Sequence, residues 1–131
     1  MRASVLAVLI TGMALLAAAV PSSAHHSFAA EFDATKPVEL TGVVTKVEWM
    51  NPHIYFYVDV KDETGKVTNY ACEGGAPNGL YRNGWRKDSL KPGDEVSIDG
   101  WRAKDGSNTV NAGSVVLPDG KRVFAGNAAE Q

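Results

Sequence analysis

The clearest pattern in the chain is the alternation of apolar and polar side chains between residues 53 and 60. Ile54, Phe56 and Val58 fall on one face of an extended strand, and the residues between them fall on the other. The polar segment 62–65 follows, and Gly65 suits the left-handed position of a tight hairpin turn. Alternation followed by such a turn predicts a β-hairpin.

The hairpin also predicts which residues face each other. It places Phe56 opposite Cys72 and Val58 opposite Tyr70, so Cys72 faces the core. Cys72 is the only cysteine, and we expect an inert, buried thiol rather than an internal disulfide. The other face of the hairpin then carries His53, Tyr55, Tyr57, Asn69 and Glu73.

Further β-rich segments surround this hairpin. They are Val38–Val47, Glu95–Arg102, Thr109–Leu117 and a short piece at Lys121–Phe124. The segment Leu80–Leu90 predicts a short helix or an irregular link, because Gly84 disfavours a long helix. The chain is therefore predicted to be all-β, a small five-stranded barrel with this link between its third and fourth strands. We expect Trp85 and Trp101 to fill the core.

The first 24 residues have the composition of a secretory signal peptide. Arg2 precedes an uncharged apolar run from Val5 to Val20, and small residues lead up to Ala24. The run is shorter than the ~20 residues that a bilayer span requires. We predict cleavage after Ala24, an N-terminal arm at 25–37, a barrel at 38–124 and a flexible tail at 125–131. The mature protein is expected to be periplasmic or secreted, with no membrane attachment.

Charge narrows the class of partner. Removal of Arg2 leaves 12 basic and 15 acidic side chains, whereas nucleic-acid-binding domains are typically basic with clustered charge. We therefore expect no nucleic acid as partner, and instead a metal ion, a small ligand or a periplasmic protein.

Two resemblances support this interpretation. The strand order from Val38 to Val116 resembles the oligonucleotide/oligosaccharide-binding (OB) fold, which binds ligands on strands two and three. The chain is also similar to a family of small exported bacterial proteins of unassigned function. The matching segments are His-His-Ser-Phe at 25–28, Trp-Met-Asn-Pro-His at 49–53, and 82–94, which contains Gly-Trp-Arg and Leu-Lys-Pro-Gly-Asp. This resemblance implies export and a single domain, but no activity.

The predicted cleavage creates a candidate metal site. His25 becomes the first residue, so its α-amine and its imidazole can chelate one ion. His53 or His26 would supply a third nitrogen, and Glu31, Asp33 or Glu73 an axial oxygen. A nitrogen-rich set of this kind favours Cu(II), so copper is the cofactor we expect. The pattern resembles the histidine brace of exported copper proteins. The third mature residue is Ser27, so the common amino-terminal copper motif with a histidine at that position does not apply.

The alternative is a metal-free recognition module. Tyr55 and Tyr57 share one face and Trp49 lies just before them, an arrangement that can stack a sugar ring or a peptide side chain. Glu73 would lie on the same surface. The same aromatic rings could instead shield the barrel beneath the arm.

Catalytic motifs are missing from the sequence. It contains no nucleophile elbow, no phosphate-binding glycine loop and no HExxH zinc motif. We therefore assign no catalytic residue and expect binding rather than catalysis. A copper oxygenase would use the same brace, so the ligand pattern alone does not separate the two.

Overall fold

Six strands and two short helices make up the part of the chain that the computed structural model describes, residues 28–126. In chain order they are α2 (Phe28–Glu31), β1 (Phe32–Glu48), β2 (Tyr55–Lys61), β3 (Val67–Glu73), α3 (Pro77–Arg82), β4 (Glu95–Ala103), β5 (Thr109–Val116) and β6 (Arg122–Phe124). The expected signal peptide lies outside the described residues. Neither of the two helices within 28–126 has the length and apolar character needed to cross a membrane.

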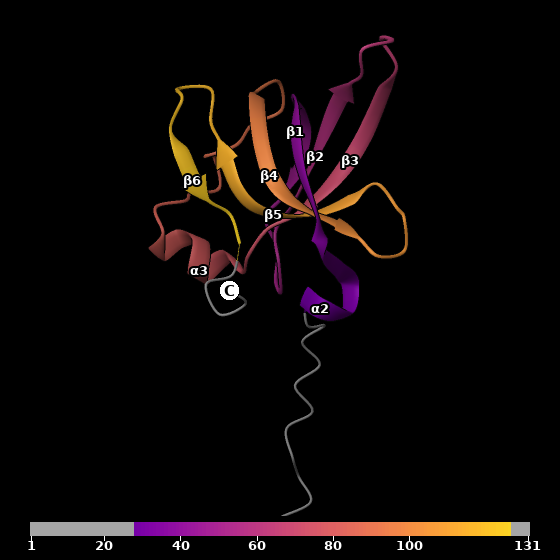
Figure 1. Ribbon diagram of the computed structural model, residues 1–131. Helices are drawn as coiled ribbons and strands as arrows, with labels where there is room; N and C mark the ends of the chain where they lie inside the picture. The colour runs from indigo at the N-terminus through magenta and orange to yellow at the C-terminus, as the bar shows by residue number, and fades with distance from the viewer. Residues whose placement is uncertain (1–27, 127–131) are drawn as a thin grey trace, which may run out of the picture.

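Five of these strands form a closed ring. β1 pairs antiparallel with β2 and β4, β2 pairs with β3, and β4 pairs with β5. A parallel contact between β3 and β5 completes the ring, and β6 extends the sheet beyond β5. Figure 1 shows α3 at one end of this barrel, between β3 and β4 in the chain. The predicted all-β barrel with a helical link is confirmed.

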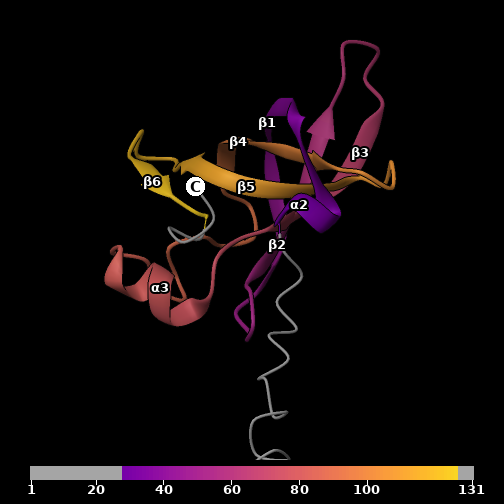
Figure 2. The ribbon, with the colours of Figure 1, turned by 60° about the horizontal axis from the view of Figure 1, so that its bottom comes forward.

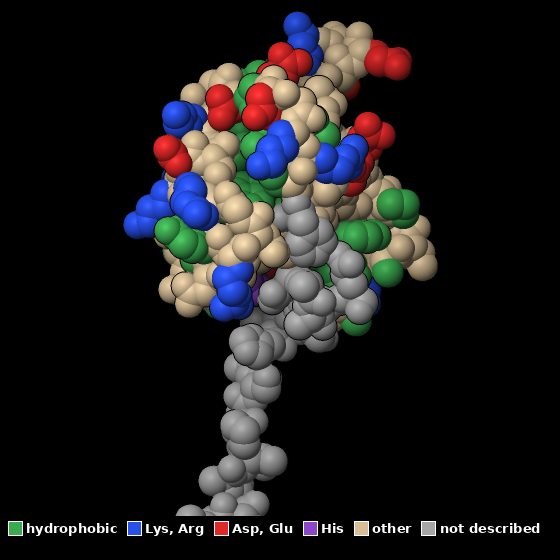
Figure 3. All heavy atoms as spheres, turned by 90° about the vertical axis from the view of Figure 1, so that its left-hand side faces the viewer, with side chains coloured by type: hydrophobic (Ala, Val, Ile, Leu, Met, Phe, Trp, Pro, Cys, Tyr) green, Lys and Arg blue, Asp and Glu red, His purple; other side chains and the backbone are tan. Residues whose placement is uncertain are grey.

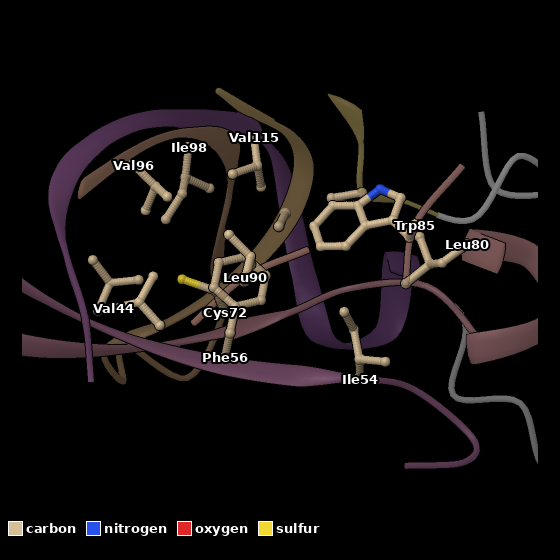
Figure 4. Packing of buried hydrophobic residues seen from close by; sticks show 13 residues of the cluster. Val44, Ile54, Phe56, Cys72, Leu80, Trp85, Leu90, Val96, Ile98 and Val115 are labelled. Carbon is tan, nitrogen blue, oxygen red and sulfur yellow. The ribbon is translucent and has the colours of Figure 1, made fainter. Parts of the chain in front are cut away.

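The interior is filled from several strands at once. Figure 4 shows Val44, Phe56, Cys72, Ile98 and Val115 pointing toward one another from five strands, and each is at most 1% exposed. Trp85 lies beside Leu80 and Ile54, where it closes one end of the cluster. Burial of this much apolar surface is the main stabilising contribution in a fold without a disulfide.

The predicted hairpin is confirmed in detail. Phe56 pairs with Cys72 and Val58 with Tyr70, as the alternation requires. Gly65 has a φ of 87°, and the carboxylate of Asp62 accepts hydrogen bonds from the backbone of the same turn. The turn therefore sets the register, and the register sends Cys72 into the core.

The first strand begins at Phe32 rather than at Val38. Phe32 is 3% exposed and pairs with Ala103, and an irregularity before Pro37 separates this contact from the regular ladder with β4. Burial of the Phe32 ring thus draws part of the expected arm into the sheet. α3 likewise begins at Pro77 rather than at Leu80, since proline is well tolerated in the first turn of a helix.

The prediction that Trp101 fills the core is wrong. Trp101 is only partly buried and is not part of the core cluster. Ile98 and Gly100 of β4 are buried, and Trp101 follows them in the alternation. The Phe28 ring meets its indole edge-on, with the ring centroids 5.4 Å apart. Trp101 therefore holds α2 against the barrel.

Close strand packing at Gly100 yields a stability prediction. A Cβ at this position would overlap the backbone carbonyl oxygen of Asn111 on β5. We expect Gly100→Ala to lower the free energy of unfolding by about 1–3 kcal/mol, as overpacking typically does. Gly79→Ala in α3 is the matched control, because nothing lies within 4 Å of its added Cβ. Urea unfolding of both variants measures the difference; equal stabilities would contradict the account.

Candidate functional site

Two loops bring His53 and Glu73 together at one end of the hairpin. His53 lies two residues before β2, and Glu73 is the last residue of β3, directly opposite Tyr55. The backbone N–H of Ile54 donates to the carbonyl of Gly75 (3.1 Å), and that of Gly74 donates to the carbonyl of Ile54 (2.9 Å). These hydrogen bonds extend the pairing of the two segments beyond the ends of β2 and β3, and they hold His53 next to Glu73.

Glu73 is the central polar group of this site. Glu73 is a buried acidic residue, with 6% of its surface exposed. The Tyr55 hydroxyl donates to its Oε2 at 2.8 Å, and Nδ1 of His53 lies 2.6 Å from its Oε1. A buried carboxylate is costly unless it is hydrogen-bonded, and here each oxygen has a partner.

Tyr55 is held as a neutral donor. Burial, and then the hydrogen bond and negative charge of Glu73, raise the pKa of the Tyr55 hydroxyl well above its usual range. Because the phenol keeps its proton at any physiological pH, it continues to donate to Glu73. Tyr55 therefore supports the carboxylate of Glu73 as a hydrogen-bond donor.

A pocket of about 370 Å³ opens beside this network. Its walls come from α2 and the start of β1, from Tyr55 and Glu73, and from the β4–β5 hairpin. The Lys104 side chain donates to the carbonyl of Ala29, and its backbone N–H donates to the carbonyl of Glu31 at 2.8 Å. In Figure 2, α2 lies close to the start of β5, consistent with the hydrogen bonds from Lys104. The start of the described chain is thus fixed next to Glu73.

A second tyrosine–carboxylate pair lies further along the same sheet face. The Tyr57 hydroxyl donates to Oε2 of Glu48 at 2.9 Å, and the Lys46 ammonium lies 5.3 Å from the centre of the Tyr57 ring. Lys46 also pairs with Glu48, and these hydrogen bonds lower the pKa of the Glu48 carboxyl. Trp49 packs against the core cluster. The hydroxyls of Tyr55 and Tyr57 thus each donate a hydrogen bond to a carboxylate, that of Glu73 and that of Glu48.

Other candidate metal ligands of the sequence include His25, His26 and Cys72. His25 and His26 lie outside the described residues. Among residues 28–126, no three His, Cys, Asp or Glu side chains come together as a metal-binding group. Cys72 is fully buried, and burial raises the pKa of its thiol to about 12, so it is no thiolate ligand. Within residues 28–126, therefore, no such group surrounds His53.

Surface charge is mixed on one face of the molecule. On the face shown in Figure 3, acidic and basic side chains are interspersed, and neither sign forms a continuous patch. This face lacks the single-sign field that would attract a polyanion.

The chain belongs to a family of unknown function (DUF6152), which matches residues 13–112. The matched segment contains His25, His53 and Glu73. A search of curated proteins finds no match.

The hydroxyl of Tyr55 should contribute measurably to stability. We expect Tyr55→Phe to lower the free energy of unfolding by about 1–3 kcal/mol, because a buried carboxylate loses one of its donors. Tyr57→Phe is the matched control, since its partner Glu48 is more exposed and keeps Lys46. Urea unfolding should show the smaller loss for Tyr57→Phe; an equal or larger loss there would contradict this description of Glu73.

Proposed function

We propose that the mature protein is an exported copper(II)-binding protein that uses the α-amine and imidazole of His25 together with the imidazole of His53. His26 is the other ring that could complete the set. An amine and imidazoles form the nitrogen-rich donor set that Cu(II) favours. The bound ion would be the ligand that the protein carries, and we assign no catalytic step to it.

The observation that carries the proposal is the pocket shared by α2 and Glu73. Ala30 and Glu31 form one wall of that pocket, and Glu73, which contacts His53, forms another. His25 precedes the first residue of α2 by three positions. Three residues extend to at most about 11 Å, so the proposal requires the shared ion to lie within about that distance of the start of α2.

The alternative is a metal-free ligand on the OB-like face formed by β2 and β3. The pocket beside Tyr55 favours it, because a small molecule could enter there. Against it, both tyrosine hydroxyls are bonded to carboxylates, and Lys46 lies near the Tyr57 ring. Neither hydroxyl is therefore free to donate a hydrogen bond to such a ligand, so we favour copper.

Calorimetric titration of the mature protein with Cu(II) tests the proposal. We expect one ion per chain, and an affinity at least about tenfold lower in His53→Ala, a loss of about 1.4 kcal/mol. Binding should weaken as the pH falls, because the α-amine, with a reference pKa of ~7.7–8.0, must lose its proton. Met50→Ala is the control, since Met50 is exposed in the loop that precedes His53.

A second variant tests the free amine. Three residues, Gly-Ser-Gly, are added before His25, because one added residue would place His26 third in the chain and create a different copper chelate. We expect the extended protein to bind at least about tenfold more weakly. Equal affinity in the mature and extended proteins would exclude the amine as a donor, and no binding in either would leave the metal-free alternative.

A further inference from the structure

We propose that Glu73, supported by Tyr55, positions His53 so that Nε2 is the nitrogen presented to copper. This inference rests on the proposed function and adds a residue to it. Its basis is geometric. Nδ1 of His53 is 2.6 Å from Oε1 of Glu73, and the Tyr55 hydroxyl is 2.8 Å from Oε2.

The chemistry of these groups decides which ring nitrogen is free. A carboxylate only accepts hydrogen bonds, so its short contact with His53 requires a proton on Nδ1. A neutral imidazole carries one proton, so Nε2 keeps its lone pair. The arrangement selects one tautomer of His53 before any metal arrives.

The frame behind the ring is rigid. Tyr55 and Glu73 are directly paired residues of the β2–β3 ladder. The hydrogen bonds between Ile54 and the Gly74–Gly75 loop fix the backbone that carries His53. A Cβ on Gly74 would lie 2.7 Å from Cγ1 of Ile54, so the loops are tightly packed. The His53 side chain is 21% exposed, which limits its freedom but leaves it open on one side.

This pattern differs from an ordinary surface histidine. Histidines that bind metals almost always donate their second ring N–H to a carboxylate, a carbonyl or water, which fixes the ring and raises its basicity. Glu73 supplies that acceptor from a buried position. Because Oε1 of Glu73 lies against Nδ1, an ion on Nε2 would lie on the opposite side of the ring, so Glu73 is a positioning residue rather than an axial ligand.

The protein contains its own comparison for this effect. Glu48 and Tyr57 form the same carboxylate–hydroxyl pair on the same sheet face, but their third partner is Lys46. Substitution at Glu48 therefore tests what loss of a tyrosine-bound carboxylate does without any histidine. Glu48→Gln is the matched control for Glu73→Gln.

The experiment combines two readouts on the mature protein. Glu73→Gln preserves size, and its amide can accept from Tyr55 while donating to Nδ1 of His53. We expect long-range ¹H–¹⁵N correlation spectra of the metal-free protein to show the His53 proton moving from Nδ1 to Nε2. Cu(II) affinity should fall about 10–100-fold, the usual effect of losing such a partner. Glu48→Gln should change neither readout.

Glu73→Asp separates position from charge. It keeps the negative charge but shortens the side chain, so we expect the Nδ1 contact to be lost and the Cu(II) affinity to fall by a comparable factor. Wild-type affinity in Glu73→Asp, or an unchanged tautomer and affinity in Glu73→Gln, would overturn the positioning role. Failure of the wild-type protein to bind copper would instead overturn the proposed function, and this inference with it. The metal-free spectra report the Glu73–His53 contact in either case.

Discussion

The buried carboxylate of Glu73 is the group around which the site is arranged. A charge in this position is tolerated only if donors surround it, and Tyr55 and His53 are the donors. The end of β3, the loop before β2 and the orientation of the His53 ring all depend on this requirement. The contact with Glu73 also occupies Nδ1 of His53, which lies two residues before β2.

The barrel positions the polar network because the β2–β3 hairpin has one face in the core and one face outside it. Phe56 and Cys72 pack into the core, while their neighbours Tyr55 and Glu73 form the polar network. Because side chains alternate along a strand, packing of one face fixes the positions of the other. The site therefore obtains its rigidity from the hydrophobic core, and Trp101 adds the attachment of α2 through Phe28.

The hairpin that carries the site was predictable from the sequence, because its register is set by residues close together in the chain. The turn at Gly65 and the alternation from Ile54 to Val58 determine the hairpin register, and the same register places Glu73 opposite Tyr55. The contact of Glu73 with His53 was not predicted, since it depends on hydrogen bonds between two loops outside the strands. The early start of β1 at Phe32 depends on tertiary packing, which overrides strand propensity. The outward position of Trp101, by contrast, follows from the same alternation that places Ile98 in the core. The copper ligands at the amino terminus remain a prediction from the sequence.

The central claim is that His53 and the mature amino terminus share one Cu(II) ion. Pulsed electron paramagnetic resonance of the copper-loaded mature protein tests it most directly, since the remote nitrogen of each coordinated imidazole modulates the echo. The account predicts the modulation of two imidazoles in the wild-type protein and of one in His53→Ala. Identical modulation in the two proteins would contradict it.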